Sequence, residues 1–213
     1  MFSQALFYDF IDQEAEAEKT MAEAKQAHLR NASRGAPSIY MTAADFLLKC
    51  KATQLTERAL AQELLTATDK VEPYLLLSRL KQQQGNLENA LELLKKTLDA
   101  NLDNPEVWAA FGHFHYGNKQ FKDAQAAYET LLSLPLEPRN IALVYYRLGN
   151  IYFSKGKEND QVMNMAKTMF LRACVASPTA NGWLGVGKAC YHLQEFVDAE
   201  DALSVRFLDL SRT

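Results

Sequence analysis

The sequence predicts an all-α protein built from repeated helical hairpins, and three observations support this prediction. First, the chain of 213 residues contains only 9 Gly and 6 Pro, and its long segments are rich in Ala, Leu, Glu, Lys and Gln, which favour helices. Second, Tyr40, Tyr74 and Trp108 follow one another at equal intervals of about 34 residues. Third, Ala90 and Ala124 are separated by the same interval, so independent positions share one period.

The stretch Asn181–Leu203 shows what one repeat contains. Its large and small residues occur at fixed offsets, in the order Trp183, Val186, Gly187, Cys190, Phe196, Ala199 and Leu203. The pattern describes two short helices, and its small residues mark where the helices cross most closely, with Gly187 facing Ala199. It is similar to the tetratricopeptide repeat (TPR), a helical hairpin of about 34 residues. The predicted fold class is therefore a right-handed TPR solenoid with an N-terminal helix.

Residues 1–37 are predicted to form one or two N-terminal helices and a linker. The segment Asp12–Arg30 is rich in Ala, Glu and Lys, with acidic residues early and basic residues late, which complements a helix dipole. An extended, coiled-coil-like arm and a solvated capping helix both fit this composition. The breaker-rich stretch Asn31–Ser38 then separates the segment from the repeats.

From residue 38 to residue 213 the chain is predicted to form a TPR-like superhelix in which each unit touches only its neighbours. The predicted units are a degenerate hairpin at 38–70, regular units at 71–104 and 105–138, a unit with an insertion at 141–179, and an incomplete last unit at 180–213.

The insertion follows from one spacing. The interval from Gly149 to Ala166 is longer by about five residues than the equivalent interval from Gly112 to Ala124. The extra residues fall within Lys157–Asn164, where they predict either a longer turn or a longer helix.

The composition excludes several classes of partner. A formal net charge of −3 gives no strongly basic surface for nucleic acid or for a membrane surface. No run of about 18 apolar residues is present to span a bilayer. The three cysteines, Cys50, Cys174 and Cys190, are an odd number and lack CxxC spacing, which is typical of reduced, buried thiols. Met1–Phe10 lacks the basic start of a signal peptide. We therefore expect a cytoplasmic protein without nucleic-acid or membrane partners.

The sequence offers no pattern for catalysis, a cofactor or a metal. The glycines that precede Lys188 lack the spacing of a phosphate-binding loop, so we interpret them as packing residues. His113 and His115 point about 200° apart on a helix and cannot share a metal. We predict a non-enzymatic protein with no cofactor; stabilisation by a nucleotide or a divalent metal in a thermal-shift measurement would contradict this.

The candidate binding residues lie on the first helix of each unit, which lines the inner face of a TPR superhelix. They are the residues one and four positions after the central Gly or its equivalent, together with one tyrosine: Arg79, Gln82, His113, Tyr116, Tyr146, Asn150, Phe153, Lys188 and Tyr191. Aromatic and basic or neutral polar side chains predict a groove for an extended or helical peptide with some acidic character. Packing between units would also account for several of these aromatics.

A receptor for acidic C-terminal peptides of chaperones is the alternative function. TPR modules of that kind clamp a terminal carboxylate through Lys and Asn on successive first helices. Gly149-Asn150 resembles part of this signature, but His113 stands where another Asn or Lys is needed. Micromolar binding of an EEVD-like peptide that is lost on Asn150→Ala would favour the receptor over a scaffold.

The run Phe170–Ser204 is similar to the C-terminal TPR region of a cilia- and flagella-associated protein of the axonemal central apparatus. It reads FLRACVASPTANGW followed by LGVGKACYHLQEFVDAEDALS. The resemblance implies a scaffold in motile cilia or flagella that holds axonemal components and performs no catalysis. It also implies further repeats after AEDALS, whereas here the chain reads SVRFLDLSRT. We therefore expect no further amphipathic helix there and an uncapped C-terminal end at which a partner or a second copy packs.

The close helix crossing at Gly187 can be tested by overpacking it. Gly187→Leu is expected to lower the free energy of unfolding by about 2–4 kcal/mol, because the larger side chain forces the two helices apart. Urea denaturation measures this loss, and near-wild-type stability would contradict the close crossing.

Overall fold

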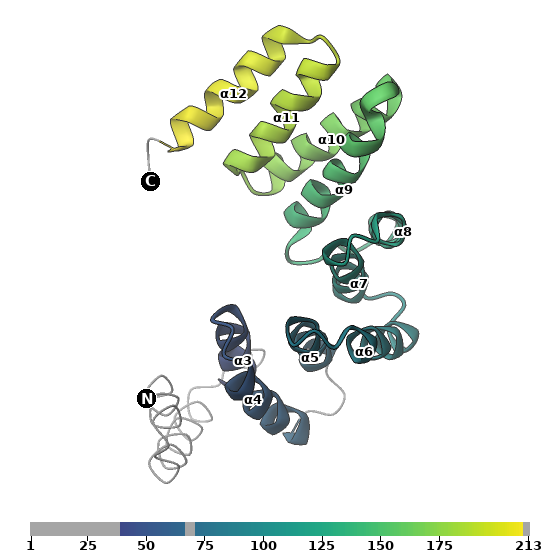
Figure 1. Cartoon of the computed structure of the whole chain (residues 1–213), viewed down its shortest axis with the longest axis vertical. Coiled ribbons are helices and arrows are strands. Elements are labelled where there is room, and N and C mark those ends of the chain that lie inside the picture. Colours follow the sequence, from purple (N-terminus) through teal and green to yellow (C-terminus); the bar gives the residue numbers. More distant parts are fainter. Residues whose placement is uncertain (1–38, 67–70, 211–213) are drawn as a thin grey trace. The chain divides into compact units, whose positions relative to one another are not determined.

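The computed structural model describes residues 39–66 and 71–210, and every regular element within these stretches is helical. The helices follow one another as antiparallel hairpins (Figure 1). This confirms the predicted all-α, TPR-like fold for the described residues. The predicted N-terminal helix at 1–37 lies outside them. The chain divides into two compact units, residues 1–97 and 98–213, and each is described by itself.

The first unit contains two hairpins, formed by α3 (Ile39–Lys49), α4 (Thr53–Thr66), α5 (Val71–Gln83) and α6 (Leu87–Ala100), the last of which crosses the boundary with the second unit. Its core is built from leucines and alanines, including the fully buried Leu60 and Leu80.

Two side-chain contacts add to the core of this unit. Lys81 Nζ forms an ion pair with Glu57 Oε1 at 2.9 Å, and Gln83 Nε2 donates to the Leu48 carbonyl oxygen at 3.3 Å. These contacts join α5 to both helices of the preceding hairpin.

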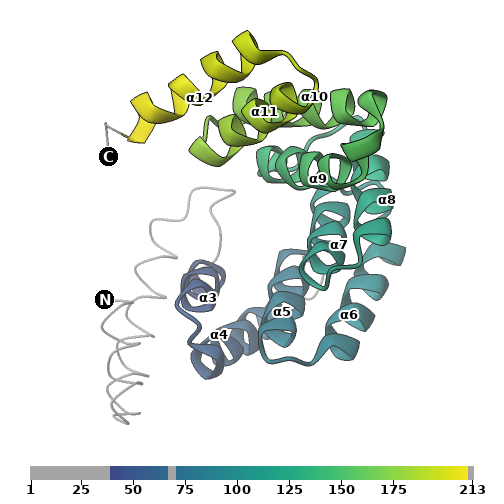
Figure 2. The same ribbon diagram turned by 45° about the horizontal axis from the view of Figure 1, so that its top comes forward.

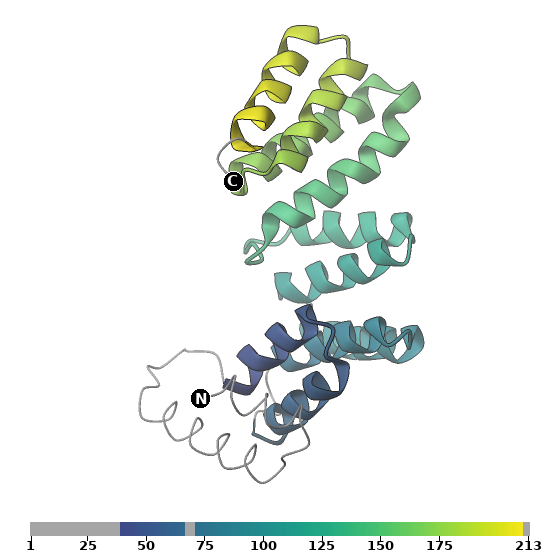
Figure 3. The same cartoon turned by 60° about the vertical axis from the view of Figure 1, so that its left-hand side comes forward.

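The second unit contains three hairpins, formed by α7 (Pro105–Gly117), α8 (Phe121–Leu132), α9 (Ile141–Lys155), α10 (Asp160–Ala176), α11 (Ala180–His192) and α12 (Phe196–Leu210). In Figures 2 and 3 the neighbouring hairpins α9–α10 and α11–α12 lie side by side.

Polar residues at the helix starts explain several of these boundaries. Asn104 accepts from Glu106 N at 3.0 Å, Asn159 accepts from Gln161 N at 3.0 Å, and Thr179 accepts from Gly182 N at 3.1 Å. Each cap satisfies a backbone donor that has no partner within the helix.

The turns inside four hairpins repeat one backbone conformation. One residue of each turn adopts a positive φ between 59° and 80°, and these residues are Lys51, Gly85, Lys119 and Gln194. The first three are separated by equal intervals of about 34 residues, so the period of the sequence is also the period of this turn. A left-handed residue lets the chain reverse direction within a few residues after a helix.

The hairpin α9–α10 does not use this turn, because the predicted insertion changes it. A short 3₁₀ segment, Gly156–Glu158, connects its helices. The helices are 15 and 17 residues long, compared with 13 and 12 in α7 and α8. The extra residues therefore lengthen both helices and do not form a long exposed loop.

Glycines on the first helices make room for one large side chain from a second helix. A Cβ atom at Gly149 would lie 2.8 Å from Phe170 Cδ1, and one at Gly185 would lie 2.6 Å from the same atom. Phe170 is only 1% exposed, so its ring fills the space between α9 and α11. Tyr128 stands against Gly112 in the same way.

At Gly187 the structure corrects one detail of the prediction. A Cβ there would meet Leu203 Cγ at 2.8 Å, whereas Ala199 contributes only its carbonyl oxygen, at 3.5 Å. The close crossing is present, but the side chain one turn after Ala199 fills it.

A second correction concerns the end of the chain. The structure continues α12 to Leu210, so residues 204–210 extend the last helix, where we expected no further amphipathic helix. The physical reason is that Val197–Leu210 contains neither Gly nor Pro to end the helix.

The fit of Phe170 can be tested with a double-mutant cycle. Gly185→Ala is expected to lower the free energy of unfolding by about 1–3 kcal/mol, because the added methyl group meets the ring. Combined with Phe170→Leu the two losses should not add, because a smaller side chain accepts the methyl group. Urea denaturation of the two single variants and the double variant measures the coupling, and strict additivity would contradict the fit.

Candidate binding surface

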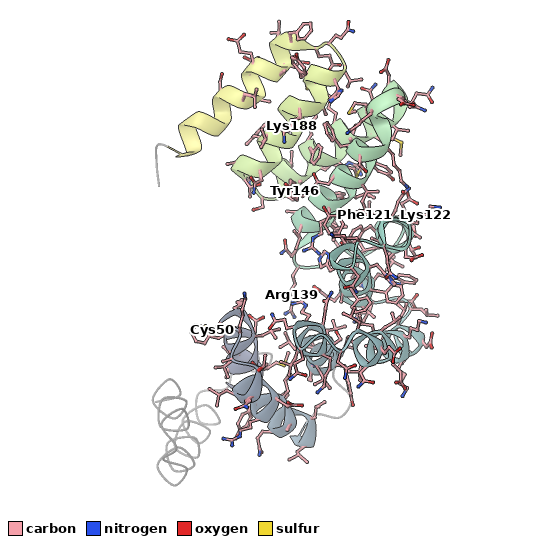
Figure 4. All side chains as sticks on the ribbon, viewed as in Figure 1. Cys50, Phe121, Lys122, Arg139, Tyr146 and Lys188 are labelled. Carbon is pink, nitrogen blue, oxygen red and sulfur yellow. The ribbon has the colours of Figure 1, made fainter. Side chains whose placement is uncertain are left out.

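Seven of the nine predicted binding residues lie in the second unit, on α7, α9 and α11. We name these seven the first-helix surface: His113, Tyr116, Tyr146, Asn150, Phe153, Lys188 and Tyr191. Figure 4 labels Tyr146 on α9 and Lys188 on α11. Arg79, which is exposed, and Gln82, which is half-buried, lie on α5 in the first unit. The seven residues of the first-helix surface thus belong to one compact unit.

His113 contacts the second helix of its own hairpin. Its Nδ1 lies 2.7 Å from the hydroxyl oxygen of Tyr128, and the two rings meet edge to face at 5.5 Å. Tyr128 is fully buried, and this burial raises the pKa of its hydroxyl to about 12, although the nearby Arg147 acts in the opposite direction. His113 thus connects the surface to the core.

Tyr116 joins α7 to α9 through a cation. The guanidinium carbon of Arg147 lies 5.0 Å from the centre of the Tyr116 ring, within the range of a cation–π interaction. Phe121 meets the same ring edge to face at 5.5 Å. Arg147 is half-buried and lies beside Tyr146 in the sequence. Arg147 therefore places a positive charge next to two predicted binding residues, Tyr116 and Tyr146.

Tyr146 and Phe153 lie against the buried Phe170, with ring centres 5.9 Å and 6.5 Å from it. Phe153 also meets the ring of His192 on α11 at 5.3 Å. Both aromatics are half-buried. They therefore pack between hairpins, as the packing interpretation expects, and still present part of each ring to solvent.

Lys188, Tyr191 and Asn150 complete the first-helix surface. Lys188 is exposed and Asn150 is half-buried. Tyr191 is 66% exposed, and its ring lies 5.8 Å from that of Phe196, which is also exposed. These three residues offer an amine, an amide and an aromatic ring to a binding partner.

Charge is divided unequally between the first and second helices of this unit. Neither α9 nor α11 carries an Asp or Glu, and α7 carries only Glu106, whose carboxylate accepts from Arg139 N at 2.7 Å. By contrast, α8, α10 and α12 carry seven acidic residues, namely Asp123, Glu129, Asp160, Asp198, Glu200, Asp201 and Asp209. The first helices therefore favour negatively charged ligands more than the second helices do.

One of these acidic residues, Asp198, already has a cationic partner. Lys167 forms an ion pair with Asp198 at 3.6 Å and another with Glu195, the residue that precedes α12. The hydrogen bond between Lys167 and Glu195 raises the pKa of the Lys167 amine and lowers the pKa of the Glu195 carboxyl group. The contacts join α10 to the start of α12.

No group of His, Cys, Asp and Glu residues within the described stretches could hold a metal ion. His113 and His115 contact different partners, because His115 Nδ1 lies 2.7 Å from Gln120 Oε1. Cys174 and Cys190 are buried as predicted, whereas the prediction was wrong for Cys50, which is exposed just after the C-terminal end of α3. Burial raises the pKa of the Cys174 and Cys190 thiols, which disfavours the reactive thiolate. Among the helices of the described residues, none combines the length and apolarity that crossing a membrane requires.

Sequence reasoning missed Arg147 and His192, which contact predicted residues. Arg147 lies three positions before Asn150, and residues at this spacing share one face of a helix. The spacing could therefore have identified Arg147 as a candidate binding residue. The contact of His192 with Phe153 joins two helices, and no spacing within one repeat indicates it.

Comparison with protein families gives one match over most of the chain. A model described as the C-terminal domain of cilia and flagella-associated protein 70 matches residues 12–206. The human cilia- and flagella-associated protein 70 is 36% identical over 169 residues, which cover 78% of this chain and 15% of the human protein. The protein of the same name from Macaca fascicularis is 40% identical over 80 residues, or 38% of this chain and 7% of that protein. The chain thus matches a small part of these relatives.

Solved structures share the fold. The structure reported as a functional characterization of Pseudomonas aeruginosa pilF matches with a TM-score of 0.66 and 19% identity, over 78% of this chain and 74% of that one. A crystal structure of MamA matches with a TM-score of 0.60 and 18% identity, over 83% and 97% of the two chains. BtubC from P. vanneervenii matches with a TM-score of 0.64 and 17% identity, over 81% and 79%. At these identities the likeness concerns the fold alone.

The buried hydroxyl of Tyr128 predicts how stability depends on alkaline pH. Its pKa in the folded protein, about 12, is higher than its ordinary value of 10.0. Below pH 10 this group does not change stability with pH. Between pH 10 and 12 the unfolded state releases the proton first, so stability falls by up to about 1.4 kcal/mol per pH unit.

Tyr128→Phe removes the hydroxyl and with it this contribution to the pH dependence of stability. The variant is expected to be less stable at neutral pH by about 0.5–1.5 kcal/mol, because the hydroxyl contact with His113 is lost. Its stability should then fall less steeply than that of the wild type above pH 10. Urea denaturation between pH 7 and 11.5 measures both effects, and parallel curves would rule out the raised pKa.

Proposed function

The chain belongs to the family of the C-terminal domain of cilia and flagella-associated protein 70, and from this premise we propose that it is a non-catalytic scaffold that binds proteins in cilia or flagella. TPR-like hairpins support this proposal, because successive helices place side chains on one continuous surface. The names of the human and macaque relatives associate them with cilia and flagella, which supports the same location for this chain.

The first-helix surface is the proposed binding site, and one observation carries the proposal. Exposed or half-buried aromatics and the cations Arg147 and Lys188 come from helices that hold no acidic residue except Glu106 at the start of α7. Aromatic rings with a polar edge supply contact area, and cations select the charge of the partner. The ligand that fits is an extended or helical peptide rich in Asp or Glu, with at least one apolar side chain.

A receptor for chaperone C-terminal tails is a second candidate function. Asn150 and Lys188 occupy equivalent positions on α9 and α11, each directly after a buried glycine. This arrangement favours a contact with a terminal carboxylate, which a scaffold for internal acidic segments would not need. A peptide with a free C-terminus and the same peptide with an amidated one distinguish the two: equal affinity favours the scaffold.

The charge of the first-helix surface is tested with Lys188→Glu. The probe is a fluorescein-labelled acidic peptide of about 14 residues that contains one Phe and one Leu. Because the substitution places a like charge beside the ligand, we expect about tenfold weaker binding in fluorescence polarization. Binding by the wild type should also weaken as salt increases.

Lys122→Glu is the matched control, since Lys122 is an exposed lysine on α8 outside the first-helix surface (Figure 4). It changes the net charge by the same amount and should leave the affinity nearly unchanged. Equal losses in the two variants would mean that only net charge matters, and the proposed site would be wrong.

A further inference from the structure

A separate surface lies between the second helices α8 and α10 of the same unit, which together with one face of α9 border an open cleft of about 460 Å³. We name it the α8/α10 cleft, and its lining residues are Glu129, Leu132, Ser133, Leu148, Tyr152, Gln161, Asn164, Met165, Thr168 and Met169. None of them belongs to the first-helix surface.

The cleft is built from helix faces. The residues from each helix are three or four positions apart: Glu129 and Leu132 on α8, Leu148 and Tyr152 on α9, and Met165 and Met169 on α10. Each helix therefore contributes one face over successive turns. The backbone groups of these walls are already bonded within the helices, so they offer no edge to an extended strand. A ligand that satisfies its own backbone, namely a helix, suits such walls.

Methionines make one wall adaptable. Three of the six methionines of the chain, at positions 163, 165 and 169, lie in α10. Met163 is buried in the core, but Met165 is 45% exposed and Met169 is half-buried in the cleft. Unbranched, polarizable side chains of this kind can fit apolar groups of different shapes, which is why they recur on surfaces that bind amphipathic helices.

The insertion in the hairpin α9–α10 extends the same wall. Ala166 on α10 is equivalent to Ala124 on α8 in the repeat. α8 begins three residues before Ala124, at Phe121, whereas α10 begins six residues before Ala166, at Asp160. Residues 160–162 therefore have no equivalent in α8, and Gln161 from this added turn lines the cleft. The insertion thus lengthens the α10 wall of the cleft and adds no residue to the first-helix surface.

The charge of the cleft is negative. Glu129 is the single ionisable carboxylate or amine among its lining residues, and it is exposed. Its Oε1 accepts from the Tyr152 hydroxyl at 2.6 Å and from Gln125 Nε2 at 2.6 Å. These bonds hold the carboxylate at the wall of the cleft, where it favours a positively charged group on a ligand.

We propose that the α8/α10 cleft binds an amphipathic helix of a partner protein. The helix inserts apolar side chains between Leu132 and Met165, and it places a Lys or Arg beside Glu129. The chain would then bind two kinds of partner, a basic amphipathic helix here and an acidic segment on the first-helix surface. This inference does not depend on the proposed function.

The probe for this proposal is a displayed library of helical peptides of about 14 residues, with positions i, i+3, i+4 and i+7 and the positions that flank them randomised. Selection uses the full chain. Enriched peptides are expected to carry Leu, Met or Phe at these positions and a flanking Lys or Arg. Chemical shifts of the methionine methyl groups should change at Met165 and Met169 when such a peptide is added, and remain unchanged at Met41, which lies in the first unit.

Thr168→Arg tests whether these peptides occupy the cleft. Thr168 is exposed and lines the cleft, so the longer, charged side chain fills it without entering the core. Affinity for the enriched peptides should fall about tenfold or more. Met165→Ala, a milder change, should weaken binding by about threefold. Val175→Arg is the matched control, because Val175 lies on the same helix, is 87% exposed and does not line the cleft.

Three results would overturn the proposal. The first is a set of enriched peptides that Thr168→Arg does not weaken while the variant remains folded by circular dichroism. The second is binding that Lys188→Glu weakens instead, which would assign the peptides to the first-helix surface. The third is a concentration-dependent dimer that Thr168→Arg dissociates, because the occupant would then be a second copy of this chain.

Discussion

The second unit depends on one buried ring, that of Phe170. It stands between Gly149 on α9 and Gly185 on α11, and a Cβ at either position would come within 3 Å of the ring. The spacing of α9, α10 and α11 is therefore set by the Phe170 side chain and by two glycines, which have no side chain. Tyr146 and Phe153 pack against the same ring from α9. Two residues that we propose for binding thus pack against a ring that is itself buried.

The same arrangement, a large side chain of a second helix packed against a glycine of a first helix, recurs in the other hairpins of this unit. Tyr128 fills the space at Gly112, and Leu203 fills the space at Gly187. In each case the large side chain lies one helical turn after a buried alanine of the second helix, namely Ala124, Ala166 or Ala199. Because repeats contact mainly their neighbours, each contact of this type fixes one local geometry. Tyr128 also has a hydroxyl group, which contacts His113 Nδ1. Phe170 and Leu203 have no polar group for such a contact.

How much the sequence could predict depends on whether a feature lies within one repeat. The regular period, the small residues at helix crossings and the lack of phosphate-loop spacing before Lys188 all follow from residues close in sequence, and the helical, TPR-like fold was confirmed. For the extra residues between Gly149 and Ala166, the sequence left a longer turn and a longer helix open as alternatives. In the structure Gly156 packs closely against the backbone of Met163, and no spacing in the sequence reveals this contact.

Features that join different repeats were harder to predict. Arg147 lies over Tyr116, a residue of the preceding repeat, and the sequence alone does not show this pairing. The α8/α10 cleft combines residues from three helices and carries no motif, so it was not predicted. His113 was predicted as a binding residue, whereas the structure places its Nδ1 against Tyr128. The binding role of the seven residues on the first-helix surface is a proposal, and that of Arg79 and Gln82 stays a prediction from the sequence.

Site-specific photo-crosslinking in ciliated cells tests the central claim, that the first-helix surface binds acidic segments of partner proteins. A photoreactive amino acid is placed at position 188 in one version of the chain and at position 122 in another, and crosslinked peptides are identified by mass spectrometry. Our account predicts crosslinks from position 188 to segments rich in Asp and Glu, and few from position 122. Equal crosslinking at both positions, or crosslinks from position 188 to segments without acidic residues, would contradict it.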